Sequence, residues 1–104
     1  MNETVTHEEL QQHVIELAHR LGWVVAHFRP AKTDKGWRTA VAADGAGFPD
    51  LVMVRERMVV AEIKTEKDQP SFEQWEWMYL FQHAGCEAFL WRPSDWDEIV
   101  EVLQ

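Results

Sequence analysis

Three charged residues interrupt two otherwise apolar runs near the middle of the chain. Asp50 lies at the start of one run, and Glu62 and Lys64 lie near the end of the next one. Because side chains alternate between the two faces of a strand, Glu62 and Lys64 would project from one face about 6.6 Å apart. A hairpin turn over 55–57 would pair positions whose numbers add up to about 112, which places Asp50 opposite Glu62. The sequence therefore predicts two carboxylates within cross-strand reach of each other, with an amine beside them.

Two neighbouring carboxylates need a proton or a cation between them, because their negative charges repel. Hard oxygen ligands of this kind suit Mg²⁺ or Mn²⁺, and the backbone carbonyl of Ile63 could add another oxygen. Lys64, beside such a metal, could orient an attacking water or stabilise the charge that develops on a phosphate. The alternative is a salt-bridged patch on a solvated sheet face, which is the commoner origin of an isolated E-x-K pattern. The combination of acids and lysine on neighbouring strands favours the metal site.

The elements around these residues predict an α/β domain with a mixed sheet flanked by helices, in the order α-β-β-β-α-β-α. Two capping boxes, Thr6 to Glu9 and Ser71 to Gln74, are typical of helix starts, and a glycine follows the end of each helix. The expected helices cover about 7–21 and 72–84, with a short third helix after Pro93-Ser94-Asp95. Apolar and β-branched runs predict strands at 23–28, 48–54, 58–64 and 87–91, and a loop extends from 30 to about 47.

Length and composition indicate one domain that spans 1–104. The chain has 104 residues, of which 46% are hydrophobic, and this supplies enough apolar surface to exclude a disordered chain. The single cysteine, Cys86, cannot form an intrachain disulfide, and the sequence contains neither a membrane span nor a signal segment. We therefore expect a cytoplasmic protein without membrane association.

Charge is distributed unevenly along the chain. Acidic residues outnumber basic ones by 18 to 10, and the net charge of −8 argues against DNA coating by a generally basic surface. One basic segment is readable, between Phe28 and Ala40, and it also carries an aromatic ring. Such a mixture suits contact with phosphates and stacking on bases, while a solvated mobile loop is the alternative. The candidate DNA-binding residues are Arg29, Lys32, Lys35, Trp37 and Arg38.

The spacing of P-D followed by E-x-K resembles the motif of the PD-(D/E)XK nuclease superfamily. More closely, the segments 47–52, 60–66 and 71–74 resemble the VRR-NUC family of virus-type replication-repair nucleases, and the likeness extends from about Glu8 to Pro93. The resemblance implies a restriction-endonuclease-like core and an Mg²⁺- or Mn²⁺-dependent endonuclease that hydrolyses DNA phosphodiester bonds. It also implies a relation to Holliday junction resolvases, with branched or junction DNA as the expected substrate. Because this family includes standalone members in phages and bacteria, the resemblance implies that the protein acts in a bacterial or phage-infected host cell.

The resemblance also implies roles for individual residues. Asp50 and Glu62 match the metal-binding acids, and Lys64 matches the catalytic lysine. Gln74 matches a glutamine that follows the E-x-K strand and belongs to the surround of the active site, although it is also the capping partner of Ser71.

An acid on the first helix normally completes the site of this family, as a catalytic residue and a metal ligand. Glu9 is the best match, but it is also the residue that would close the capping box with Thr6. Both roles remain open for Glu9, and Glu8 and Glu16 are possible substitutes.

Two other functions compete with a nuclease. One is a non-catalytic module that binds DNA structures, and the other is an interaction subunit of replication or repair. The complete set of Asp50, Glu62 and Lys64 disfavours the first. The helix at 72–84 is apolar on most sides, which predicts deep burial or an interface. A chain of this size has little room to bury such a helix, so we expect a homodimer with a second active site.

Overall fold

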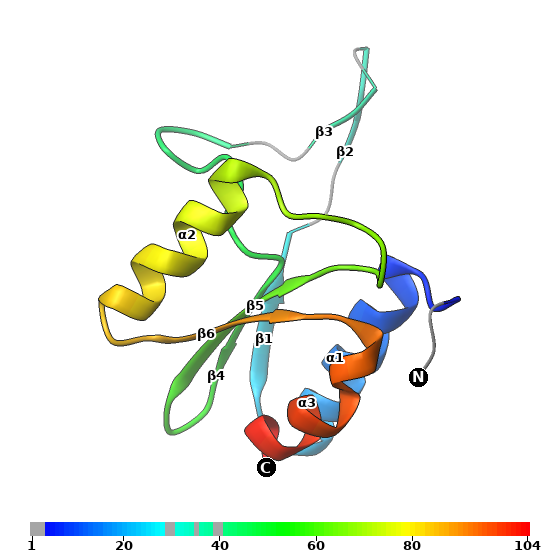
Figure 1. Cartoon of the computed structure of the whole chain (residues 1–104), viewed down its shortest axis with the longest axis vertical. Coiled ribbons are helices and arrows are strands. Elements are labelled where there is room, and N and C mark those ends of the chain that lie inside the picture. Colours follow the sequence, from blue (N-terminus) through cyan, green and yellow to red (C-terminus); the bar gives the residue numbers. More distant parts are fainter. Residues whose placement is uncertain (1–3, 29–30, 35, 39–40) are drawn as a thin grey trace.

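The computed structural model describes residues 4–28, 31–34, 36–38 and 41–104, and the side chains at 31–33, 37 and 38 lie outside this description. Figure 1 shows a sheet with helices on both faces and a small separate hairpin. Along the chain the elements are α1 (His7–Arg20), β1 (Val24–His27), β2 (Ala31–Thr33), β3 (Gly36–Arg38), β4 (Leu51–Val54), β5 (Met58–Ile63), α2 (Phe72–His83), β6 (Glu87–Trp91), the 3₁₀ turn η1 (Pro93–Asp95) and α3 (Trp96–Leu103). In the described part of the chain, no helix combines the length and apolar character needed to cross a membrane.

The main sheet has four strands in the order β1-β4-β5-β6. β4 pairs antiparallel with both β1 and β5, whereas β5 pairs parallel with β6, so the sheet is mixed, as predicted. In the β4–β5 hairpin Leu51 pairs with Ala61 and Val52 with Val60. The predicted register is therefore confirmed, and it places the acids at the open end of the hairpin.

Both predicted capping boxes are present. At the start of α1, the Thr6 hydroxyl accepts from the backbone of Glu9 at 3.1 Å, and the Glu9 carboxylate accepts from the backbone of Thr6 at 3.0 Å. At the start of α2, Ser71 and Gln74 exchange the equivalent pair of hydrogen bonds at 3.1 and 2.8 Å. These bonds satisfy backbone N–H groups that a helix start otherwise leaves without partners, so both helices begin at defined residues.

The two faces of the sheet bury different sets of side chains. The face covered by α1 and α3 holds the larger cluster, to which β4 and β5 contribute alternate residues such as Leu51, Met53 and Ile63. The face covered by α2 holds a smaller cluster of Val60, Met78 and Ala88. Since side chains alternate along β5, Glu62 shares the face of Val60 and points toward α2.

The segment predicted as a loop over 30–47 contains a two-stranded hairpin, in which Thr33 of β2 pairs with Gly36 of β3. This prediction was wrong for 31–33 and 36–38. The sequence pattern conceals the hairpin because its strands are only three residues long and rich in charge. Gly36 has a positive φ of 98°, which a glycine adopts without steric cost. Figure 1 shows the hairpin projecting beyond the end of β1, away from the body of the domain.

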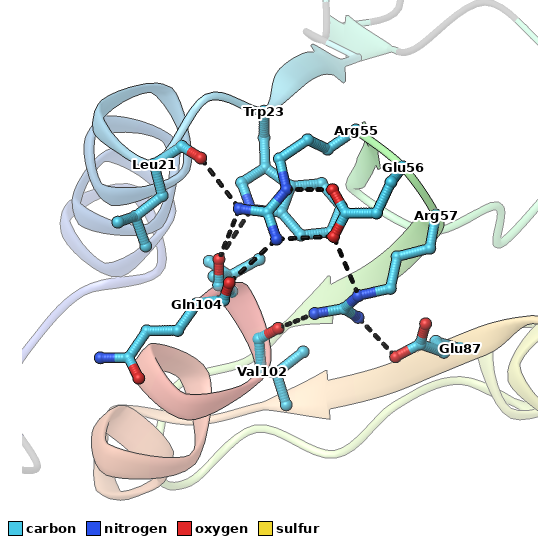
Figure 2. A network of polar contacts seen from close by, with 9 residues as sticks. Leu21, Trp23, Arg55, Glu56, Arg57, Glu87, Val102 and Gln104 are labelled. Atoms are coloured by element: carbon cyan, nitrogen blue, oxygen red, sulfur yellow. Dashed lines mark hydrogen bonds and ion pairs between the residues drawn. The ribbon is translucent and has the colours of Figure 1, made fainter.

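Arg55 and Arg57, in the turn between β4 and β5, bind this end of the sheet to α3 (Figure 2). It is the end of the hairpin that lies away from the acids. Arg57 donates to the carbonyl of Val102 and to the carboxylate of Glu87, the latter at 2.6 Å. The guanidinium of Arg55 lies 4.7 Å from the ring centre of Trp23. Arg55 also donates to three backbone carbonyls, those of Leu21, Leu103 and Gln104. The carbonyl of Leu21 lies at the end of α1 and those of Leu103 and Gln104 at the end of α3, so Arg55 supplies donors to carbonyls that the helix ends leave unpaired.

Candidate active site

The β4–β5 hairpin brings Asp50 and Glu62 together at its open end. Asp50 directly precedes β4, and its Oδ2 accepts a hydrogen bond from the backbone N–H of Ile63 at 2.9 Å. This bond extends the contact between the two strands by one step beyond the paired residues, so Asp50 is fixed relative to the end of β5. Glu62 is the neighbour of Ile63, and the proximity of Asp50 to Glu62 contributes to a raised pKa of the Glu62 carboxyl.

Glu62 is the one fully buried charged residue in the described part of the chain, with 2% of its surface exposed. Its Oε2 accepts a hydrogen bond from Gln74 at 2.9 Å and lies 3.5 Å from the amine of Lys64. The other oxygen, Oε1, is buried and has no hydrogen-bond partner among the described residues. Burial raises the pKa of Glu62 from 4.5 to about 7, Asp50 adds to the rise, and Lys64 opposes it.

Lys64 lies just beyond β5, where its side chain is mostly buried. Its backbone N–H donates to the carbonyl of Trp91 at 2.9 Å, which continues the parallel pairing with β6 past the last strand residue. The alternation of β5 therefore extends to Lys64 and sends its side chain to the face of Glu62. Only 15% of the Lys64 side chain is exposed, so the amine is held at the site and does not extend into solvent.

Gly47 allows the segment that leads into Asp50 and β4 to approach α2. Its φ is +80°, and a Cβ placed on it would lie 2.6 Å from the Cβ of Glu73 and 2.8 Å from the backbone nitrogen of Gln74. Any larger residue would have to displace the first turn of α2. The close contact brings Gln74 to the site, where it links α2 to Glu62. Gln74 makes two contacts at once, because its Oε1 accepts from the backbone of Ser71 while its Nε2 donates to Glu62. The first is the predicted cap, and its role in an active site stays a prediction.

The first helix contributes a histidine to the site, which the sequence analysis did not identify. His7 Nε2 lies 3.2 Å from Asp50 Oδ2, and the hydrogen bond to Asp50 raises the pKa of His7 above 6.5, although burial opposes the rise. Of the two roles left open for Glu9, the structure shows the cap. Its carboxylate is bonded to Thr6 and fully exposed. The sequence shows only that His7 lies two residues before Glu9 at the start of the helix, and no local pattern predicts its contact with Asp50.

A divalent cation fits the residues that the structure brings together. No group of three or more His, Cys, Asp and Glu side chains in the described ranges forms a ready-made metal site. Mg²⁺ does not require one, because it is commonly bound through one or two carboxylates and keeps several waters. Asp50 and Glu62 are the carboxylates that would hold it, and Oε1 of Glu62, which has no hydrogen-bond partner among the described residues, is an oxygen that a cation would satisfy.

The predicted DNA-binding residues lie in or beside the β2–β3 hairpin. Arg29 and Lys35 lie outside the described residues, and so do the side chains of Lys32, Trp37 and Arg38. The backbone places Lys32 in β2, with Trp37 and Arg38 in β3. Their contact with DNA therefore stays a prediction.

α2 is less buried than its sequence predicts. Met78 is its one buried residue, and the aromatic side chains of Phe72, Trp75 and Tyr79 are 51–75% exposed. Deep burial was therefore wrong as an expectation, because the sheet covers only the side of α2 that carries Met78 and Phe81. An interface on the exposed side, and with it a homodimer, stays a prediction.

No family model matches the chain, and no curated protein sequence matches it. Several solved structures are similar to it, among them two with VRR_NUC domains. One, a VRR_NUC domain, has a TM-score of 0.67 and 21% sequence identity, over 91% of this chain and 94% of the other. The second, a VRR_NUC domain protein, has a TM-score of 0.62 and 22% identity, over 95% of this chain and 85% of the other. At these identities the likeness concerns the fold. The chain therefore has the fold of VRR_NUC domains, as its motifs predicted.

Proposed function

We propose that this chain is a metal-dependent nuclease of the VRR-NUC type that hydrolyses DNA phosphodiester bonds. The observation that carries the proposal is the Glu62 carboxyl, which is buried beside Asp50 and Lys64 and retains one oxygen without a partner in the part of the chain that the structure describes. A buried carboxylate without complete hydrogen bonding destabilises the folded protein. Groups of this kind with strongly raised pKa values are common in active sites. The shared fold with VRR_NUC domains supports the same function.

In this proposal Asp50 and Glu62 hold Mg²⁺ or Mn²⁺, with the carbonyl of Ile63 as a further oxygen. When bound, the cation polarises a phosphoryl oxygen and makes a coordinated water more acidic. The backbone of Ile63 and the ring of His7 fix Asp50, while Gln74 fixes Glu62. These contacts hold the carboxylates in place before substrate binds, which reduces the reorganisation needed during the reaction.

Lys64 acts on the substrate in this mechanism. Its side chain is largely shielded from solvent, and its amine lies 3.5 Å from Glu62. A charge in such a position stabilises the negative charge that accumulates on the phosphate in the transition state, and it can orient the attacking water. The role is distinct from metal binding, so it can be tested separately.

The proposed substrate is DNA, with branched or Holliday-junction DNA as the leading class on the basis of the resemblance. The protein carries a net charge of −8, so DNA must approach through the cation and through a local basic region. The segment 29–38 is that region in the proposal, and its residues contact phosphates. We further propose a homodimer, which would present two active sites to a two-fold symmetric junction, in the cytoplasm of a bacterial or phage-infected cell.

A cleavage screen tests the activity. Linear, nicked, flapped and four-way DNA are incubated with the protein in Mg²⁺ and in Mn²⁺, and cutting of at least one of them is expected. Lys64→Met should lower cutting by about 100-fold or more, because it removes charge stabilisation from the chemical step. Calorimetry should show that the variant still binds Mn²⁺.

The matched control for this experiment is Lys67→Met, since Lys67 is exposed and lies three residues further along the chain. It should cut like the wild type. Undiminished cutting by Lys64→Met would contradict the assignment of the site. Absence of cutting on all four DNAs in both metals would favour the non-catalytic binding module.

The charge argument gives a second test. Without a cation, Asp50 and Glu62 repel phosphate, so the wild type should bind DNA weakly in EDTA and more tightly in Ca²⁺. Asp50→Asn removes one negative charge at nearly constant size. It should lose metal-dependent cutting and yet bind DNA in EDTA at least as tightly as the wild type. Fluorescence anisotropy measures both affinities, and a wild type that is indifferent to Ca²⁺ would contradict the metal site.

A further inference from the structure

A cavity of about 460 Å³ lies directly beside the proposed metal site. Asp50 and Gln74, which belong to the site, form one end of it. The remaining wall is largely apolar, and it includes Phe28, Phe48 and Val41. The volume lies within the range of roughly 300–1,000 Å³ that is usual for pockets that bind small molecules. None of the proposed steps at the metal uses this space.

The wall of the cavity is anchored to α2. The ring of Phe48 packs edge to face against Trp77, with the ring centres 5.1 Å apart, and against Phe81 at 5.8 Å. Trp77 Nε1 in turn donates to the backbone carbonyls of Asp44 and Ala46, at 3.2 and 3.0 Å. These bonds tie the segment before Gly47 to the helix, so this side of the cavity is formed before any ligand binds.

The two phenylalanines that line the cavity form a corner. The rings of Phe28 and Phe48 are nearly perpendicular, at 84°, and their centres are 5.6 Å apart. Phe28 is 51% exposed and Val41 is 57% exposed, so both lie at the open side, where a ligand would cover them. A flat aromatic ligand could stack on one ring and contact the edge of the other, which is the favourable geometry for aromatic groups.

We propose that this cavity receives an unpaired nucleobase next to the phosphate that is cut. The inference rests on the proposed function, because a DNA strand whose phosphate reaches Asp50 carries the adjacent base past the cavity mouth. A base has apolar faces that match the phenylalanines, whereas its sugar and phosphate are polar and remain outside the cavity. Base stacking on aromatic side chains of this kind depends little on sequence.

An unpaired base is favoured over a paired one for a physical reason. In a duplex both faces of each base are covered by its neighbours, and extrusion costs unstacking and unpairing energy. A base at a flap, a bulge or a branch point is already unpaired and partly unstacked, so the cost of moving it into the cavity is lower. The cavity therefore selects DNA with an unpaired nucleotide at the cut and discriminates against continuous duplex.

The test compares two duplexes that differ only in whether one 2-aminopurine is bulged or paired with thymine. Affinities are measured by anisotropy in Ca²⁺, and the shielding of 2-aminopurine is measured by acrylamide quenching. The wild type should bind the bulged duplex about tenfold more tightly, which is the size of one base–aromatic contact, and should shield its 2-aminopurine from acrylamide. Phe28→Ala should lose both effects and leave the affinity for the paired duplex unchanged.

Two further variants accompany this experiment. Val41→Trp should also remove the preference, because its added volume fills the cavity at an exposed position that tolerates the change. Tyr79→Ala is the matched control, since Tyr79 is an exposed aromatic residue of α2 that does not line the cavity, and it should retain the preference.

An equal preference in the wild type and in Phe28→Ala would overturn the proposal. A change in the elution volume of Phe28→Ala on gel filtration, without a change in preference, would do the same, because it would identify the cavity as a contact between copies of the chain. The failure of the proposed function is separate from these outcomes. It would appear as an absence of cutting in Mn²⁺, whereas the base preference is measured without cutting.

Discussion

Glu62→Gln should stabilise the metal-free protein at alkaline pH while abolishing its activity. Glutamine has nearly the same shape as glutamate and resembles its protonated form. The wild-type carboxyl is 2% exposed, and one of its oxygens lacks a partner among the residues that the structure describes, so its ionisation in the folded state is unfavourable. Removing the charge removes that cost.

The pKa of Glu62 sets the magnitude and the pH range. It is about 7 in the folded protein, against an ordinary value of 4.5. Because the folded-state value is the higher one, stability is lost as pH rises from 4.5 to 7, and the loss is complete above 7. The shift corresponds to about 3 kcal/mol. This figure already includes the attraction of Lys64, which lowers the pKa.

Urea unfolding in EDTA measures the effect. The free energies of unfolding of Glu62→Gln and wild type should nearly coincide at pH 4 and should differ by about 3 kcal/mol at pH 8, with the variant more stable. This difference is a shift of roughly 2 M in the urea midpoint. Saturating Mn²⁺ should stabilise the wild type by about 3 kcal/mol at 100 times its dissociation constant. It should leave the variant unchanged.

Glu76→Gln is the matched control, because it makes the same chemical change at an exposed position of α2. It should show no pH-dependent difference from the wild type. The reasoning is refuted if Glu62→Gln is less stable than the wild type at pH 8 in EDTA. It is also refuted if Mn²⁺ stabilises the variant as much as it stabilises the wild type.

Three further tests, two of them with a control variant, concern the residues that support the site. Gly47→Ala should destabilise the protein by roughly 2–4 kcal/mol in urea unfolding, from its positive φ and its contact with α2, whereas Gly85→Ala, with a similar φ and open space, should cost about 1 kcal/mol. Arg57→Met should lower stability by about 1–3 kcal/mol, because it leaves two acceptors without their donor. The temperature midpoint checks this result. His7→Ala should weaken Mn²⁺ binding by about 10- to 100-fold in calorimetry, while Glu9→Ala should lower the melting temperature and leave Mn²⁺ affinity unchanged.

The main sheet and the position of the acids were predictable because they depend on local rules. A three-residue turn fixes the register of a hairpin, and the alternation of side chains then determines which of them share a face. These two rules alone predict that the side chains of Asp50, Glu62 and Lys64 lie close together on one face of the sheet. The helix starts were equally accessible, since a capping box is a four-residue pattern that satisfies backbone donors.

His7 could not be predicted in the same way. Its contact with Asp50 spans 43 positions in the sequence, and it depends on how the start of α1 packs against the sheet edge. No residue near His7 marks it as different from the other histidines. Glu9 was the more plausible metal ligand because it is an acid, but its carboxylate accepts a hydrogen bond from the backbone N–H of Thr6. The local hydrogen bond competes with any longer-range role, and in the structure the local one is formed.

The register of the β4–β5 hairpin makes the alignment of the acids at its open end depend on contacts at its turn. Asp50 lies one residue before β4 and Lys64 one residue after β5, so the pairing of these strands with their neighbours determines where the two side chains lie. A slip of one residue would turn Glu62 from the α2 face to the apolar core under α1 and α3, where its charge would have no partner. At the far end, Arg57 ties the turn to Glu87 of β6 and to Val102 of α3. These bonds oppose such a slip, and the alignment of the acids therefore depends on contacts at the end of the sheet farthest from them.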